Sequence, residues 1–266
     1  MLIDTHAHLD FPDFTADLPE VIARAVAAGV GRMVAIGCDL ESSRRAVALA
    51  ERFPEVYATV GWHPGHVEQA PEDVRPGLEG LVGHPRVVAI GECGVDHYRL
   101  PGTVEDARIR ARQRAVFAQQ LALAAEAGLP CVVHQREAFG EALAAVTPWA
   151  GKVRTVFHCF VGTPAEAAAV VRLGSLVSFT GILTFKNAGA VRETLAAVPA
   201  GSFLLETDCP YLAPVPHRGR RCEPAYVADL ARVAAEVRGV EVERLAVETA
   251  ATAAAFFPAD RWAAAG

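Results

Sequence analysis

The sequence predicts a single α/β domain over residues 1–266, a TIM-type (β/α)₈ barrel with an extra C-terminal helix. Three observations predict this fold. Eight short apolar runs alternate with Ala-rich stretches of helical spacing, an order typical of α/β proteins. The length of 266 residues suits eight strand–helix units in one closed barrel. Polar residues collect at the ends of the apolar runs, where a barrel has its active-site face.

The eight apolar runs are predicted to be parallel strands buried on both faces. Each is too short for a typical helix, and most are rich in Val, Ile, Leu or Phe. An open doubly wound sheet is the alternative, but no G-x-G-x-x-G follows the first run, which disfavours dinucleotide binding. The predicted strands are Leu2–Thr5, Arg32–Ile36, Val56–Gly61, Val87–Gly91, Pro130–His134, Thr155–His158, Leu176–Thr180 and Phe203–Glu206.

The stretches between the strands have apolar residues at helical spacing. Ser42 suits the N-cap of the second helix, Gly128 suits the end of the longest one, and Pro164 and Pro224 suit a first helical turn. The predicted helices are Leu18–Ala28, Ser42–Arg52, Ala107–Ala127, Pro164–Leu173, Ala190–Ala197 and Pro224–Val237, with Leu245–Phe256 as the extra helix.

Composition predicts a cytoplasmic protein. Mean hydropathy is +0.24, yet no uncharged apolar run reaches the roughly 18 residues of a membrane-spanning helix. The N-terminus carries no basic segment followed by an apolar one, so no signal peptide is predicted. The six cysteines form no C-x-x-C, which favours reduced, buried thiols over zinc held by cysteine. Every apolar stripe can be assigned to the barrel, which favours a monomer.

Charge restricts the class of partner. The net charge is −6 and the pI is about 5.9. These values argue against a protein that coats long nucleic acids through a broad basic face. They are compatible with an enzyme that binds a few phosphates in a pocket.

The pair His6 and His8 at the end of the first run is the sharpest feature of the sequence. Side chains alternate along a strand, so both imidazoles point to the same side, into the barrel mouth. Two adjacent imidazoles can bind one metal ion; the alternative is a pair that only caps the barrel through hydrogen bonds. Further potential ligands at the ends of other strands favour the metal.

Four such ligands are Glu92, His134, His158 and Asp208, at the ends of the fourth, fifth, sixth and eighth runs. Together with the histidine pair they make six ligands, more than one tetrahedral zinc requires. They therefore predict two divalent ions, with Glu92 as the bridging carboxylate. Mixed imidazole and carboxylate ligands suit Zn, Mn or Fe, and a carboxylate-rich half could bind Mg.

Other carboxylates at these strand ends have possible roles. Asp208 could also take a proton from the attacking water. Asp4 and Glu206 share the strand parity of two predicted ligands and are expected to face inward. Two interpretations stay open for them: they orient metal ligands, or they are buried carboxylates satisfied by backbone groups or by Thr5 and Thr207.

Three residues are candidate substrate contacts. His63 ends the third run and is expected to contact substrate or phosphate, or else to pack on Trp62. Arg218 lies with two further arginines in a proline-rich loop after the eighth run, where it would bind phosphate or form a solvated charge cluster. Tyr98, with Asp96, follows Glu92 and could reach the same mouth.

Taken together, these motifs resemble the TatD family of metal-dependent deoxyribonucleases, within the amidohydrolase superfamily. Each motif alone is weak, but seven occur in the family's order between residue 4 and about residue 257. The matching stretches are Asp4–Asp10, Gly61–Pro64, Ile90–Asp96, Val133–Arg136, His158–Gly162, Glu206–Pro214 and His217–Gly219.

The resemblance implies a TIM-type barrel and a divalent-metal phosphodiesterase that acts on DNA, often as a 3′→5′ exonuclease. It implies that Asp208 activates the nucleophilic water and that His63 lies near the scissile phosphate. It also implies a set of ligands for each ion: His6, His8, Glu92 and Asp208 for one metal, and Glu92, His134 and His158 for the second.

Two positions depart from the family's pattern. Cys222 stands where the family usually has Asn before Glu-Pro, and Thr252 stands where Asn usually precedes Leu-Phe. Neither position is a predicted ligand. The departures therefore bear on local packing and on substrate preference, and leave the predicted chemistry intact.

Two other classes of function are the alternatives. The first is hydrolysis of an amide, lactone or ester of a small molecule, or of an aminoacyl-tRNA ester. Many such enzymes bridge their metals with a carboxylated lysine, but neither Lys152 nor Lys186 lies at a suitable strand end. The second is an inert metal-binding scaffold, which should have lost a ligand or the base, whereas all six candidates are present.

Overall fold

The computed structural model describes residues 1–262; residues 263–266, the end of the expected domain, lie outside the described part. It confirms the predicted TIM-type barrel, because eight strands pair in parallel and in chain order within one sheet. The strands are β1 (Leu2–Ala7), β2 (Val30–Ala35), β3 (Val56–Val60), β4 (Val87–Asp96), β5 (Cys131–Arg136), β6 (Thr155–Phe157), β7 (Leu176–Phe179) and β8 (Phe203–Leu205).

The barrel closes between β1 and the segment that follows β8. Ala7 and Cys209 form a parallel bridge. The backbone N–H of His8 donates to the carbonyl of Cys209 at 2.8 Å, and the N–H of Asp208 donates to the carbonyl of His6 at 2.9 Å. Closure therefore brings Asp208 beside the two histidines of β1, although about 200 residues separate them in the sequence.

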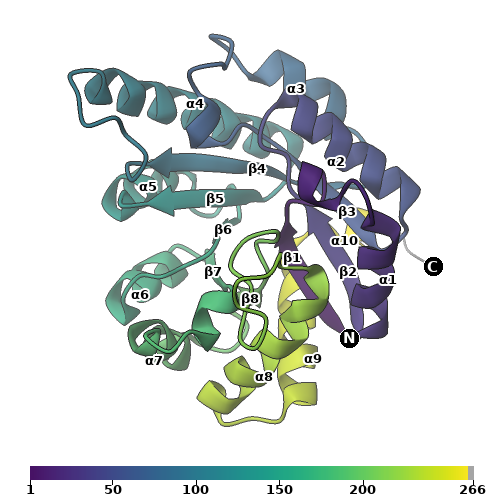
Figure 1. Cartoon of the computed structure of the whole chain (residues 1–266). Helices are drawn as coiled ribbons and strands as arrows, with labels where there is room; N and C mark the ends of the chain where they lie inside the picture. The colour runs from purple at the N-terminus through teal and green to yellow at the C-terminus, as the bar shows by residue number, and fades with distance from the viewer. Residues whose placement is uncertain (263–266) are drawn as a thin grey trace.

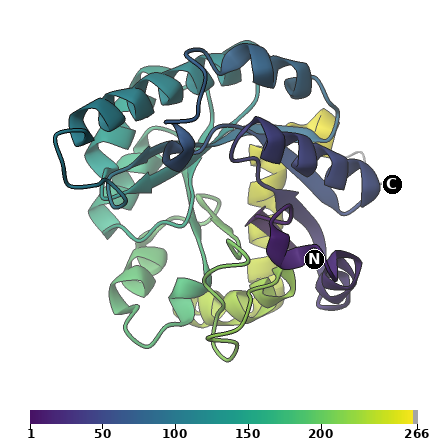
Figure 2. The same cartoon turned by 45° about the horizontal axis from the view of Figure 1, so that its top comes forward.

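Helices surround the strands on the outside of the barrel (Figures 1 and 2). The extra C-terminal segment consists of two helices, α9 and α10, where one was predicted. No helix within residues 1–262 is both long and apolar enough to cross a lipid bilayer. The helices are α1 (Leu18–Ala27), α2 (Leu40–Arg52), α3 (Arg75–Val82), α4 (Asp106–Ala127), α5 (Phe139–Val146), α6 (Pro164–Arg172), α7 (Gly189–Ala197), α8 (Val227–Arg238), α9 (Val242–Phe256) and α10 (Ala259–Trp262).

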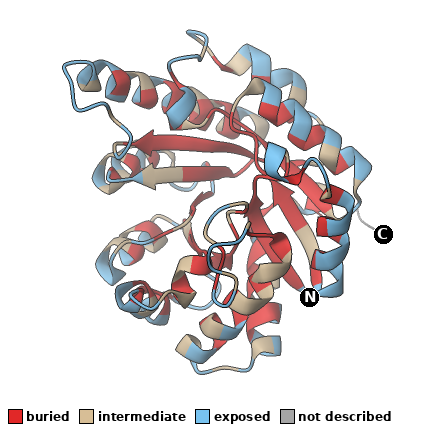
Figure 3. Cartoon of the chain, in the orientation of Figure 1, coloured by how far each residue is buried: buried red, intermediate tan, exposed pale blue. Residues whose placement is uncertain are grey.

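Burial follows the two layers of the barrel: the strands are buried, and exposed residues lie on the outer sides of the helices (Figure 3). One apolar cluster packs between the sheet and the helices. A second fills the barrel interior, where Tyr57 and Val132 belong to the same cluster as Phe256, Phe257 and Trp262 of the C-terminal segment. The C-terminal helices therefore complete the inner core, away from the polar ends of the strands.

The start of α2 differs from the prediction. Asp39, not Ser42, is the N-cap, and its carboxylate accepts a hydrogen bond from the backbone N–H of Ser42 at 2.8 Å. The Ser42 hydroxyl instead donates to Asp10 at 2.9 Å. Aspartate and serine are both good N-caps, so side-chain preference alone did not distinguish the two positions.

β4 extends five residues past its predicted end at Gly91. Its register with β5 shifts between Ile90 and Cys93, and the N–H of Glu92 donates to the carbonyl of Gly37 at 3.0 Å. An irregularity of this kind redirects a side chain. Gly94 is required within this stretch, because it has a φ of +145° and a Cβ there would lie 2.0 Å from the carbonyl oxygen of His134.

Candidate metal centre

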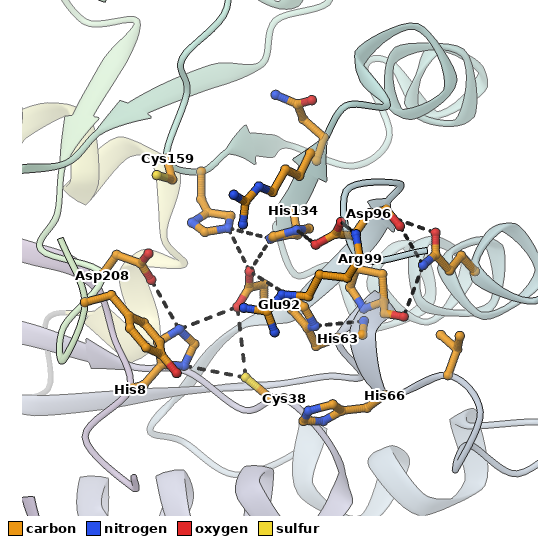
Figure 4. A pocket seen from close by; sticks show the side chains of 18 of the residues that line it. His8, Cys38, His63, His66, Glu92, Asp96, Arg99, His134, Cys159 and Asp208 are labelled. Carbon is orange, nitrogen blue, oxygen red and sulfur yellow. Dashed lines mark hydrogen bonds and ion pairs between the residues drawn. The ribbon is translucent and has the colours of Figure 1, made fainter. Parts of the chain in front are cut away.

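A cavity of about 840 Å³ opens at the carboxyl ends of the strands (Figure 4). Five of the six predicted ligands line it, and the sixth, His6, is fully buried beside them. The structure therefore brings the whole predicted set together from five strand ends. The five in the lining are His8, Glu92, His134, His158 and Asp208.

One carboxylate oxygen of Glu92 faces the β1 histidines. Oε2 lies 3.4 Å from Nε2 of His6 and 3.7 Å from Nε2 of His8. Asp208 faces the same two nitrogens, because its Oδ1 lies 3.2 Å from Nε2 of His8 and 3.6 Å from Nε2 of His6. Asp208 has a φ of +57°, a left-handed conformation that aspartate adopts more readily than most residues. Two imidazoles and two carboxylates thus converge on one point.

The other oxygen of Glu92 faces a different set of histidines. Oε1 lies 2.8 Å from Nδ1 of His134 and 2.7 Å from Nε2 of His158. His63 adds a third imidazole, with its Nε2 at 3.5 Å from the same oxygen. Glu92 is therefore in contact with both sets of imidazoles, one through each oxygen, which is the arrangement required of a bridging carboxylate.

The side chains at this centre fit divalent ions. Neither ring nitrogen of the fully buried His6 has a hydrogen-bond partner among residues 1–262, and a buried polar atom without a partner is costly. The donor atoms of His6, His8 and Asp208 lie within 4.8 Å of one another, as do those of His63, Glu92 and His134. A cation between such donors would satisfy them, and imidazole and carboxylate are common ligands of Zn and Mn.

Ionisation of the carboxylates suits the same role. Burial alone would raise the pKa of Glu92, but the charges of His158, His63 and His6 hold the pKa of this carboxyl well below its usual range. Burial would likewise raise the pKa of Asp208, but the hydrogen bond with His8 and the charge of His6 hold it below its usual value. Burial lowers the pKa of His63 to about 4. At neutral pH both carboxylates are charged and His63 is neutral.

Groups behind the ligands hold two of the rings. Asp96 Oδ2 lies 3.0 Å from Nε2 of His134. The sulfur of Cys38 lies 3.5 Å from Nδ1 of His8. A partner on the far nitrogen fixes the orientation and tautomer of a metal-binding imidazole.

Asp4 and Glu206 both face inward and are paired with backbone and threonine groups, as one interpretation predicted. The other interpretation, that they orient metal ligands, applies to Glu206. The carboxylate of Asp4 accepts a hydrogen bond from the backbone N–H of Thr207 at 2.9 Å. Glu206 accepts one from the N–H of Cys159 at 2.8 Å and lies 3.6 Å from Nδ1 of His158. Asp4 thus stabilises the segment just before Asp208, and Glu206 lies next to the predicted ligand His158.

The predicted substrate contacts have different positions. His63 lines the cavity next to Glu92. Arg218 and Tyr98 are absent from the lining formed by the described residues. Arg218 donates to the carbonyl of Ala213 at 3.0 Å, and its guanidinium carbon lies 3.8 Å from the ring centroid of Phe185. These contacts hold Arg218 against Ala213 of its own loop and Phe185 of the segment after β7, outside the lining of this cavity.

Sequence reasoning did not single out several residues that line the cavity, among them Phe11, Cys38, Arg99, Arg136 and Tyr211. Arg136 lies two residues beyond His134 on β5, so strand alternation could have indicated that it faces the mouth. The other four lie in loops, where no periodicity indicates the direction of a side chain.

The two departures from the family pattern lie outside the metal centre. Cys222 is buried, and its backbone N–H donates to the carbonyl of Pro210 at 3.0 Å. Thr252 lies within α9, where its hydroxyl donates to the carbonyl of Glu248 at 2.8 Å. Both are satisfied locally.

Comparison with known proteins finds one family over almost the whole chain. Residues 3–258 match the family model described as TatD related DNase. An uncharacterized metal-dependent hydrolase of Bacillus subtilis, YabD, is 37% identical over 97% of this chain and 99% of its own length. The 3′-5′ ssDNA/RNA exonuclease TatD of Enterobacter lignolyticus is 38% identical over 93% of this chain and 95% of its own.

The fold is also shared with solved structures. The crystal structure of YJJV, a TatD homologue from Escherichia coli, superposes with a TM-score of 0.89 at 29% sequence identity. The superposition covers 96% of this chain and 97% of that one. The similarity therefore extends over the whole barrel together with its C-terminal helices.

Proposed function

The chain belongs to the TatD-related DNase family of metal-dependent hydrolases, and we propose that it is a two-metal phosphodiesterase that removes nucleotides from the 3′ ends of single-stranded DNA. The relatives named 3′-5′ ssDNA/RNA exonuclease support a nucleic-acid substrate. The acidic net charge of −6 fits an enzyme that acts on strand ends and holds few phosphates.

The position of Glu92 is the observation that carries the proposal. Its two oxygens contact two different groups of imidazoles, at 3.4 Å to His6 and 2.7 Å to His158. A single mononuclear site would need only one of these groups. A carboxylate shared by both supports a pair of ions side by side, as phosphodiester hydrolysis uses to stabilise charge on the attacking and leaving oxygens.

Each ion has its own set of proposed ligands. His6, His8, Glu92 and Asp208 would hold one, and Glu92, His134 and His158 the other. Bound there, a divalent pair supplies positive charge for the phosphoryl oxygens and a nucleophile at neutral pH. The ions are proposed to be Mg, Mn or Zn.

The protein's own groups have separate tasks in this reaction. Asp208 Oδ1 accepts the proton of the attacking water, because its lowered pKa keeps it ionised. Neutral His63, on the cavity wall beside Glu92, contacts the scissile phosphate. Asp96 holds the His134 ring from behind, so this ligand is oriented before substrate binds.

A digest of 5′-end-labelled single-stranded DNA by metal-stripped protein, resupplied in turn with Mg, Mn and Zn, tests the proposal. We expect a ladder that shortens from the 3′ end with at least one metal. The Asp208→Asn variant, loaded in the same way, should give no ladder, and single-stranded RNA of the same sequence would reveal any discrimination against ribose. Intact DNA with all three metals would refute the nuclease and favour the small-molecule or aminoacyl-ester hydrolase.

A further inference from the structure

Two arginines line the pocket beside the metal centre. Arg99 follows β4 and Arg136 ends β5, and these neighbouring strands lie on one side of the barrel (Figure 1). They are the only arginines among the described residues that line the cavity, and no lysine accompanies them. In Figure 4, Arg99 lies on one side of Glu92, and His8 and Asp208 lie on the other. Positive charge from side chains other than histidine is therefore confined to one wall.

Neither guanidinium is paired with an acceptor of the protein over residues 1–262. Neither Arg99 nor Arg136 forms a side-chain hydrogen bond or ion pair there, and Arg99 donates to Asp96 through its backbone N–H. Arg221 differs, because it is paired with the carboxylates of Asp17 and Glu223 at 2.7 and 2.9 Å. The planar N–H edges of the two pocket arginines are thus free to bind an anion, a task for which a guanidinium is well shaped.

Tyr98 holds one of these arginines in place. The guanidinium carbon of Arg136 lies 3.5 Å from the ring centroid of Tyr98. Stacking of this kind uses the flat face of the guanidinium and leaves its N–H edge open. The sequence predicted a substrate contact for Tyr98; in this proposal Tyr98 is a positioning residue that acts through Arg136.

Two aromatic residues of the lining, Phe11 and Tyr211, lie next to His8, on the other side of Glu92 from Arg99 (Figure 4). Tyr211, in the loop after β8, has its ring centroid 6.2 Å from that of Phe11. Burial and the charge of Asp208 raise the pKa of Tyr211, while the charge of Arg99 acts in the opposite direction. Arg99, Tyr211 and Phe11 all line the same cavity of about 840 Å³.

We propose that Arg99 and Arg136 form a second anion site that binds the phosphate adjoining the scissile one. This site rests on the proposed phosphodiesterase function and deepens it: the preferred substrate carries two consecutive phosphates, one at the metal centre and one at the arginines. In the proposed function, the metal centre and His63 would bind the scissile phosphate. The adjoining phosphate needs its own cations, and no other arginine or lysine of the described lining provides them.

The test compares two small substrates that differ by one phosphate. These are the thymidine dinucleotide with a single internal phosphodiester and the same dinucleotide with a 5′-terminal phosphate. The readout is the ratio of their kcat/KM values, because general damage to the metal centre lowers both alike. For wild-type protein we expect the second substrate to be preferred by about tenfold or more, since hydrogen bonds to charged groups contribute about 1.5–3 kcal/mol.

Four variants and one control locate the effect. R99A and R136A should each bring the ratio close to one, through a higher KM for the 5′-phosphorylated substrate. Y98F should keep the wild-type ratio and Y98A should lose part of it. R220A, which removes an exposed arginine that is outside the lining, is the matched control and should keep the ratio.

The outcomes separate this proposal from the one on which it rests. A wild-type ratio near one, or a ratio that R99A and R136A leave intact, would overturn the second anion site while the nuclease stands. Bis(p-nitrophenyl) phosphate, which has a single phosphate, serves as a probe of the metal centre. Failure of wild-type protein to cleave this probe and both dinucleotides with any metal would overturn the phosphodiesterase itself.

Discussion

Asp96 Oδ2 lies 3.0 Å from Nε2 of His134, at the edge of the imidazole opposite to Glu92, which faces Nδ1 at 2.8 Å. A carboxylate in this position keeps the ring proton on Nε2 and leaves the lone pair of Nδ1 for a metal ion. Asp96 is itself fixed, because its other oxygen accepts hydrogen bonds from the backbone N–H groups of Tyr98 and Arg99. The turn after β4 therefore orients a ligand on β5.

Replacing Asp96 should weaken one ion selectively. Asp96→Asn removes the charge that fixes the His134 tautomer, so we expect metal affinity at the His134 side to fall by about 10- to 100-fold, with activity falling in parallel at limiting metal. Calorimetric titration of metal-stripped protein with Mn or Zn measures this. Asp73→Asn, at an aspartate paired only with Arg75, is the control. Two titration steps identical to those of wild type would show that Asp96 has no such role.

Replacing Glu92 should affect both ions. Glu92→Gln and Glu92→Ala remove the carboxylate that contacts both histidine sets, so we expect hydrolysis to fall by orders of magnitude while far-UV circular dichroism stays native. Metal content after gel filtration should drop below two per chain. Glu68→Gln alters another glutamate of the lining, one paired with Arg108, and should have little effect. A Glu92 variant that turns over at the wild-type rate would remove Glu92 from the mechanism.

Asp208→Asn addresses proton transfer. Asparagine keeps the size of the side chain and an oxygen ligand but cannot accept the proton of water at neutral pH, so kcat should fall by about 10²- to 10⁴-fold. Rates measured at saturating metal separate this loss from weaker metal binding. Recovery of the wild-type rate on raising the metal concentration would assign Asp208 to metal binding alone.

Replacing Arg218 should lower stability more than substrate binding, although its position in the loop after β8 had suggested a phosphate contact. Its guanidinium contacts Ala213 and Phe185, so Arg218→Ala should cost about 1–2 kcal/mol of stability from a lost hydrogen bond and a lost cation–π contact. KM for DNA should change less than in R136A. Urea denaturation and steady-state kinetics measure the two effects. A large rise in KM with unaltered stability would return Arg218 to the substrate site.

The fold could be predicted from sequence because apolar strands alternate with helical stretches. The ligand set could be predicted because its members stand at the ends of those strands. Apolar runs marked the strands, and polar residues such as His6 and His134 stood at their ends. The direction of the Glu92 side chain depends instead on the register shift between Ile90 and Cys93, which no local sequence pattern indicates. Loop residues were least predictable: Arg99 lines the pocket and Arg218 does not, although both are arginines in loops at the strand ends.

Asp4 provides a test through pH. It is fully buried, and burial raises its pKa to about 7, although the hydrogen bonds from Thr207 act in the opposite direction. In the unfolded chain an aspartate has a pKa of about 3.9. Between these two values the folded protein binds more protons than the unfolded one. The contribution of Asp4 to stability is therefore full below about pH 4 and is lost as pH rises through about 7.

Asp4→Asn should remove this dependence, because asparagine resembles the protonated acid and can still accept from the Thr207 N–H. We expect the free energy of unfolding of the variant, relative to that of wild type, to rise by up to about 1.4 kcal/mol for each pH unit between about 4 and 7. The variant should be the more stable protein at pH 8. Urea denaturation of metal-free protein at a series of pH values measures the difference. Asp13→Asn, at an exposed aspartate, is the control. If the difference between Asp4→Asn and wild type stays constant across this range, Asp4 is charged in the fold, and its hydrogen bonds with Thr207 outweigh the cost of burying the charge.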